Sequence, residues 1–128
     1  MRLPLSLIVV ATCAALAGPS VAQAVTKQFR TPTGKILCLY SDEFDDNAQI
    51  RCDMLFLNDR AAVIGRTGRG RIVKVTDAAG NPRSRVLAYG TSTRFGAYSC
   101  TSRRTGLTCR NRRTGHGFTV STQSRKGF

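Results

Sequence analysis

Short runs in which apolar and polar side chains alternate recur along the chain after residue 24, separated by Gly, Thr, Ser and Arg. Successive side chains of a strand point to opposite faces, so this alternation is typical of half-buried β-strands. No convincing amphipathic helix and no internal repeat interrupts the pattern. It predicts one all-β, or nearly all-β, domain over residues 25–128, built from small disulfide-linked antiparallel hairpins as a compact sandwich or a partly open barrel.

The clearest alternation surrounds Cys38 and Cys52. If these cysteines lie opposite each other on antiparallel strands, Tyr40 opposes Ile50, and the next pair in the other direction is also apolar. The register that a disulfide requires therefore agrees with the register that gives one apolar face. We predict a hairpin linked by Cys38–Cys52, with the acidic segment 42–48 as its loop.

A second hairpin is predicted around Cys100 and Cys109. Direct opposition of these cysteines places Ser102 opposite Leu107 and leaves residues 103–106 as a four-residue loop, whose glycine can adopt a left-handed conformation. Four cysteines allow three connectivities. We favour the two local ones, Cys38–Cys52 and Cys100–Cys109.

Three further segments complete the predicted elements. Residues 71–76 and 85–89 are short β-prone runs separated by turn residues, which predicts a third hairpin. Residues 117–121 are expected to form a last short strand. Residues 55–65 fit either a short helix capped by Asn58 or Asp59 or one more strand.

The start of the chain has the layout of a secretory signal peptide. An apolar run from Leu3 to Ala17 follows Arg2, and Ala22-Gln23-Ala24 supplies small residues at a cleavage site. We therefore predict a signal peptide at residues 1–24 and a periplasmic or extracellular location after cleavage near Ala24.

The alternatives to cleavage are a retained membrane anchor and a lipid on Cys13. The apolar run is shorter than the roughly 20 residues that a membrane span needs, and Thr12 is a poor residue before a lipidated cysteine. No later segment is long and apolar enough to span a membrane. Cleavage would also remove Cys13 and leave four cysteines, an even number that favours disulfides in an exported domain.

The chain is strongly basic, with a formal net charge of +13. All seven acidic residues lie between Asp42 and Asp77, whereas residues 78–128 contain ten basic residues and no acid. A field of one sign attracts polyanions and speeds their encounter with the protein.

Two segments of the chain resemble a known family. One is Phe29-Arg-Thr-Pro-Thr-Gly-Lys-Ile-Leu-Cys38, followed by Arg51-Cys-Asp53. The other ends in Thr108-Cys-Arg-Asn-Arg-Arg-Thr-Gly-His-Gly-Phe118. They resemble a family of small exported bacterial domains of unknown function, with an F-x-[ST]-P-[ST]-G-x-I-x-C opening and a T-C-x-N-x-x-T-G-H-G-F closing motif. The resemblance implies export and a disulfide-bonded β-rich fold, and it implies no activity. Many members have extra cysteines in the middle region, which this chain lacks.

His116 is the one candidate for a catalytic residue, because a histidine that titrates near neutral pH can act as a general base. Its nearest acid in the sequence is Asp77, 39 positions away, so a structural role in a turn is favoured. The cysteine spacings do not match zinc knuckles, and we expect no metal and no cofactor.

Clustered arginines are the candidate anion-binding residues, because guanidinium groups form paired hydrogen bonds with oxyanions. They fall in residues 66–71 and 103–113: Arg66, Arg69, Arg71, Arg103, Arg104, Arg110, Arg112 and Arg113.

The favoured function is therefore that of an exported, envelope-associated binding protein rather than an enzyme. Its partner is expected to be an anionic envelope polymer, lipid head groups or another exported protein, contacted through the arginine-rich C-terminal half. Export argues against nucleic acid. The alternatives are an inhibitor or protein-interaction module and a small hydrolase or nuclease that uses His116.

Overall fold

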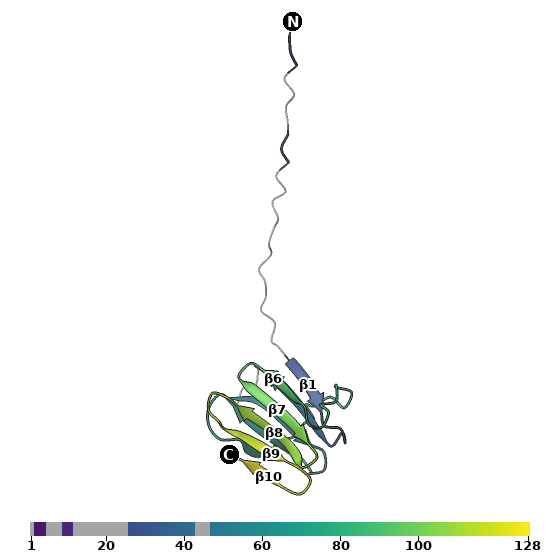
Figure 1. The fold of residues 1–128 in the computed structure, drawn as a ribbon, viewed down its shortest axis with the longest axis vertical. Helices are drawn as coiled ribbons and strands as arrows, with labels where there is room; N and C mark the ends of the chain where they lie inside the picture. The colour runs from purple at the N-terminus through teal and green to yellow at the C-terminus, as the bar shows by residue number, and fades with distance from the viewer. Residues whose placement is uncertain (1, 5–8, 12–25, 43–46) are drawn as a thin grey trace.

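The computed structural model describes residues 2–4, 9–11, 26–42 and 47–128 (Figure 1). Most of the predicted signal peptide, including Cys13, lies outside the described residues, as do residues 43–46 of the acidic loop. Among the residues described, no helix is long and apolar enough to cross a membrane.

Ten strands form two antiparallel sheets of five strands each. The first sheet contains, in spatial order, β1 (Thr26–Arg30), β2 (Ile36–Ser41), β3 (Ala48–Met54), β4 (Arg60–Gly65) and β5 (Arg71–Lys74). The second contains, in spatial order, β10 (Arg125–Gly127), β9 (Gly117–Val120), β8 (Gly106–Asn111), β7 (Tyr98–Arg103) and β6 (Ser92–Phe95). Figure 1 looks onto the second sheet, with the first behind it. The prediction of a small all-β sandwich is confirmed, and the sheets do not close into a barrel.

The core lies between the two sheets and contains both disulfides. Cys38 is linked to Cys52, and Cys100 to Cys109, each across directly opposed positions of neighbouring strands. Because a strand alternates its faces, a disulfide pointing inward directs both neighbours of each cysteine outward. The cysteines therefore decide which side chains of β2, β3, β7 and β8 reach the surface.

The hairpin of β7 and β8 is tighter than predicted. Its ladder continues to the pair Arg103 and Gly106, so the turn is Arg104-Thr105 and the predicted four-residue loop is wrong. The backbone of Gly106 has a φ of +144°, which favours glycine. As a consequence Arg103 is a strand residue and not a residue of the hairpin tip.

Residues 60–65 form strand β4, so the helix alternative for this segment is wrong. The segment does not alternate, because residues 61–65 are all buried. Its inward side chains face the second sheet. Its outward side chains lie on the outer face of the first sheet, which residues 75–91 cross. A strand covered on both faces shows a continuous apolar run, which by itself does not distinguish it from a helix.

The predicted hairpin of residues 71–76 with 85–89 is also wrong. β5 pairs with β4, and the chain then crosses the outer face of the first sheet to its opposite edge, where Val86 forms a parallel bridge with Arg30 of β1. We call residues 75–91 the crossing segment. On its way Gly80 packs so closely on Leu37 that a Cβ at position 80 would lie 2.3 Å from the Leu37 Cβ.

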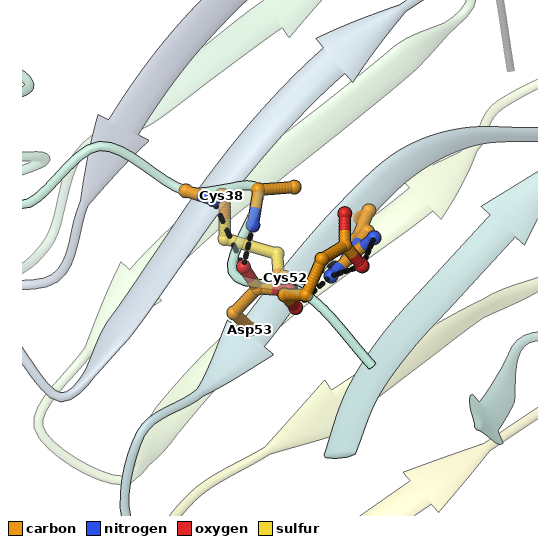
Figure 2. Close-up of polar contacts among 7 residues, drawn as sticks. Cys38, Cys52 and Asp53 are labelled. Atoms are coloured by element: carbon orange, nitrogen blue, oxygen red, sulfur yellow. Dashed lines mark hydrogen bonds and ion pairs between the residues drawn. A yellow bond between two sulfur atoms is a disulfide. The ribbon is translucent and has the colours of Figure 1, made fainter. Parts of the chain in front are cut away.

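A buried carboxylate holds the crossing segment in place. Asp53, on the outer face of β3, is 4% exposed. Its Oδ2 accepts hydrogen bonds from the backbone N–H groups of Ala79 (2.8 Å) and Gly80 (2.9 Å). Its Oδ1 accepts one from Arg51 Nε (2.8 Å), and Arg51 also contacts Asp77 of the crossing segment. Figure 2 shows Asp53 beside the Cys38–Cys52 disulfide, with dashed lines to this network.

The network stabilises the charged form of Arg51. Burial acts to lower the pKa of Arg51, but hydrogen bonding and Coulomb attraction from Asp53, followed by Asp77, outweigh it and raise that pKa. The Arg-Cys-Asp step therefore has a structural role: the cysteine points into the core, and its two neighbours attach the crossing segment to the opposite face.

Candidate functional site

The outer face of the second sheet presents hydroxyl and basic side chains. One row crosses all five strands, from Ser92 on β6 through Thr101, Thr108 and Thr119 to Lys126 on β10. A parallel row contains Arg94, Ser99, Arg110 and Gly117, and Arg103 extends the face at the far end of β7. We call the hydroxyl and basic members the hydroxyl–arginine face: Ser92, Arg94, Ser99, Thr101, Arg103, Thr108, Arg110, Thr119 and Lys126.

Strand alternation produces this face. In β7, Tyr98, Cys100 and Ser102 are buried, so the residues between and after them, including Thr101 and Arg103, point outward. The β-branched threonines also suit a pleated sheet surface. The face thus follows from the same register as the Cys100–Cys109 disulfide.

Hydrogen bonds between neighbouring strands order the hydroxyl row. Ser92 Oγ and Thr101 Oγ1 are 2.7 Å apart, and Thr108 Oγ1 and Thr119 Oγ1 are 2.9 Å apart. A hydroxyl has one donor and two acceptor positions, so each pair keeps hydrogen-bonding capacity toward solvent. The row therefore offers oriented polar groups at the strand spacing of roughly 4.8 Å.

The charge on this face is of one sign. Arg94, Arg103, Arg110 and Lys126 are exposed, and none of them has an acidic partner, since both ion pairs among the described residues belong to Arg51 on the other sheet. The Arg110 guanidinium lies over the ring of Phe128, 5.2 Å from its centroid. This contact restricts the Arg110 side chain while leaving its N–H groups available.

The face is also hollowed at its centre. Five of its side chains line a depression of about 300 Å³: Ser99, Thr101, Arg103, Thr108 and Arg110. Two arginines thus flank a floor of three hydroxyl groups. The guanidinium groups can form paired hydrogen bonds with an oxyanion of a ligand. The protein hydroxyl groups of the floor can then form hydrogen bonds with hydroxyl groups that the ligand carries beside that oxyanion.

The eight arginines predicted to bind anions do not form one cluster. Arg103 and Arg110 lie on the hydroxyl–arginine face. At the hairpin tip Arg104 stacks on Tyr89, with its Cζ 4.9 Å from the ring centroid. Arg71 lies exposed on β5 of the other sheet.

The remaining candidates belong to loops at one end of the sandwich. Arg69 Nη2 lies 3.5 Å from the carbonyl oxygen of Gly127, and Arg112 Nη2 donates to the Gly96 carbonyl at 2.7 Å. Arg66 and Arg113 both line a pocket beside Tyr98. Sequence reasoning missed Arg94, Lys126 and the hydroxyl row. A serine, threonine or basic residue at alternate positions of β6, β7 and β8 is the signal that finds Arg94 and most of the hydroxyl row, but it does not find Lys126 on β10.

His116 lies in the loop between β8 and β9 and is half-buried. Its carbonyl oxygen accepts a hydrogen bond from the Asn111 N–H (2.8 Å), and its own N–H donates to Thr114 Oγ1 (3.2 Å). Within the described part of the chain, no group of three His, Cys, Asp or Glu side chains is placed to hold a metal ion. Both of these hydrogen bonds use the backbone of His116 and shape a turn, and its catalytic role stays a prediction.

Comparison with protein-family models gives a match over much of the chain. DUF6636, described as a family of unknown function, matches residues 47–128, which is more than half of the chain. The chain belongs to this family. The DUF6636 match runs from the residue before β3 through the whole second sheet, so it includes the hydroxyl–arginine face and the Cys100–Cys109 disulfide. It confirms the resemblance to a family of unknown function.

No curated protein and no solved structure matches the chain. DUF6636 therefore supplies a family without an assigned activity. The two disulfides indicate an oxidising, exported environment.

Proposed function

We propose that this protein is an exported, non-catalytic binding module whose hydroxyl–arginine face holds an anionic polysaccharide of the cell envelope. The observation that carries the proposal is the face itself, with four basic side chains, no acidic side chain and an ordered hydroxyl row across the sheet. We place the mature domain at residues 25–128, after removal of a signal peptide at residues 1–24.

The shape of the face favours an extended polymer. Five strands about 4.8 Å apart give it a width of roughly 19 Å, so several sugar units can lie across it. Arginine forks pair with carboxylate, sulfate or phosphate groups, and the threonine hydroxyls suit the hydroxyl groups of sugars. The central depression places both kinds of contact side by side.

The face lacks the features that the other partners require. Binding to a protein relies on buried aromatic or apolar anchors, and insertion into a lipid surface relies on exposed apolar side chains. The large exposed hydrophobic residues of the described chain all lie elsewhere: Leu3, Val9, Val10, Leu55, Ile72 and Val86. A hydrated, charged polymer is therefore the partner that this surface fits best.

The proposal predicts a specific loss of binding. Replacing Arg94, Arg103 and Arg110 together with glutamine is expected to weaken binding to heparin or polygalacturonate about 10- to 100-fold at physiological salt, since three exposed charge contacts contribute on the order of 0.5–1 kcal/mol each. Affinities are measured by isothermal titration calorimetry at several salt concentrations. The slope of log K against log salt concentration should also become shallower.

A matched variant separates the face from net charge. Replacing Arg60, Lys74 and Arg83 with glutamine removes three exposed positive charges from the first sheet and the crossing segment. This variant should bind within about threefold of the wild type, because long-range attraction is screened at physiological salt. Equal weakening in both variants, or no binding by the wild type, would refute the proposal.

A further inference from the structure

A second polar pocket, separate from the hydroxyl–arginine face, opens at one end of the sandwich. It has a volume of about 320 Å³, and its lining comes from both sheets and their connections and includes Tyr40, Gln49, Arg66, Tyr98, Asn111 and Arg113. None of these residues belongs to the hydroxyl–arginine face. The size is at the lower end of the range for small-molecule sites, which is roughly 300–1,000 Å³.

A buried glutamine forms the base of the pocket. Gln49 is 7% exposed. When its amide is oriented to satisfy both ends, Nε2 donates to Tyr98 Oη at 2.8 Å, and Oε1 accepts from Arg66 Nε at 2.9 Å and Arg66 Nη2 at 2.8 Å. Gln49 thus fixes the phenol and the guanidinium relative to each other.

This arrangement leaves donors unused. Tyr98 Oη accepts its hydrogen bond from Gln49, so its own proton is available to a ligand. Arg66 uses Nε and one proton of Nη2 toward Gln49, and Nη1 remains available in this set of contacts. Burial raises the pKa of Tyr98, and Tyr40 raises it further, while Arg66 and Arg113 lower it, so the phenol stays protonated at neutral pH.

Asn111 holds the two arginine-bearing segments together. Its side chain is buried, and Nδ2 donates to the carbonyl oxygens of Gly65 (3.0 Å) and Arg66 (3.4 Å). Its Oδ1 accepts from the Arg113 N–H at 2.9 Å. One side chain of β8 therefore sets the positions of residues that are 47 positions apart in the sequence.

Two positive charges converge here without an acidic partner among the described residues. Both ion pairs of that part of the chain involve Arg51 on the outer face of the first sheet. An anion bound in the pocket would lie between these two guanidinium groups and beside the Tyr98 hydroxyl, and Coulomb attraction to both arginines would favour its binding.

We propose that this pocket binds a small oxyanion, a carboxylate or phosphate group carried on a molecule the size of a single sugar. Arg66 and Arg113 pair with its charge, the Tyr98 hydroxyl donates to one of its oxygens, and the Tyr40 ring forms an adjacent wall. Asn111 is a positioning residue for both arginines. The pocket and the hydroxyl–arginine face share no residue, so either can exist without the other.

The test is a titration of the protein with glucuronate and with inorganic phosphate, followed by amide NMR, with glucose as the neutral control. Saturable shifts of residues 49, 66, 98 and 113 with either anion, and none with glucose, are expected. Arg113→Gln, an exposed substitution, should raise the Kd about tenfold, and Tyr98→Phe should also raise it by about tenfold through loss of the hydroxyl donor.

The controls exclude a general charge effect and separate the two proposals. Arg104→Gln, at the opposite end of the sandwich, and the triple variant of Arg94, Arg103 and Arg110 should leave the Kd within about twofold. If a galacturonate oligomer binds the pocket more tightly than free glucuronate, the oxyanion that the pocket binds belongs to the end of a polymer. If it does not, the oxyanion belongs to a free small molecule. The proposal is overturned if neither anion saturates, if glucose binds equally well, or if Arg104→Gln weakens binding as much as Arg113→Gln.

Discussion

Replacing Asp53 with alanine is expected to lower the free energy of unfolding by about 3 kcal/mol, because removing one partner of a buried charged network leaves the rest uncompensated. The carboxylate accepts hydrogen bonds from Ala79 N, Gly80 N and Arg51 Nε. Its loss leaves two part-buried backbone donors without their acceptor and releases the crossing segment from the first sheet. Urea unfolding followed by circular dichroism measures the change.

Two milder substitutions test whether the buried carboxylate is responsible. Asp77→Asn affects a side chain that is 68% exposed, so it should cost less than about 1 kcal/mol. Asp53→Asn keeps an acceptor but removes the charge, and its cost should lie between those of the other two variants. An ordinary surface substitution changes the free energy of unfolding by up to about 0.5 kcal/mol. If Asp53→Ala changes it by no more than that, the crossing segment does not depend on Asp53.

The second large effect concerns the disulfides. Replacing both Cys38 and Cys52 with alanine should lower the free energy of unfolding by about 3 kcal/mol, mainly because the unfolded chain gains the freedom of a released loop. The two cysteines are separated by 14 positions, and Cys100 and Cys109 by 9. The Cys100/Cys109 variant should therefore lose slightly less, because loop entropy grows only with the logarithm of length.

Reduction of the wild type provides an independent check of the disulfide prediction. With dithiothreitol, its unfolding midpoint should fall to that of the variant lacking all four cysteines, and that variant should not respond to the reductant. A double variant as stable as the oxidised wild type would contradict the stabilising role of the bridge. Losing both bridges should cost about 6 kcal/mol, which is a large part of a domain stability of roughly 5–15 kcal/mol.

Local pattern was sufficient to predict the hairpins that the disulfides join. The register that pairs Cys38 with Cys52 also places Tyr40 opposite Ile50, and the structure has both pairs. Two independent constraints, a short covalent link and one apolar face, agree on a single register. Where only one constraint existed, as in residues 55–65, the sequence left the element undecided.

The crossing segment shows why the rest was not predicted. Residues 71–76 and 85–89 have the composition of a hairpin. In the structure, however, β5 pairs with β4, and Val86 forms a bridge with Arg30 at the opposite edge of the first sheet. Nothing local to these residues encodes a carboxylate on β3 that binds their connection. A contact made across the whole width of a sheet is set by tertiary packing, which overrides strand propensity.

The candidate site divides in the same way. Arginine density predicted two basic stretches, residues 66–71 and 103–113, whereas the structure groups Arg103 with Arg110 on a sheet face and Arg66 with Arg113 in a pocket. The hydroxyl–arginine face could have been predicted from the alternation of side chains along the strands, once Cys100 and Cys109 were placed on the inner face. The pocket could not, because it depends on buried hydrogen bonds of Gln49 and Asn111 that join distant segments.

The most direct test of the central claim is to map which residues contact an anionic polysaccharide. Amide NMR of the protein titrated with a galacturonate oligomer is predicted to show the largest shifts in β6, β7, β8 and β9, centred on Ser99, Thr101, Thr108 and Thr119. Strands β2–β4 should be unaffected, apart from Tyr40 and Gln49, which line the separate polar pocket. Shifts concentrated on the first sheet or the crossing segment, or spread evenly over all exposed basic residues, would contradict the account.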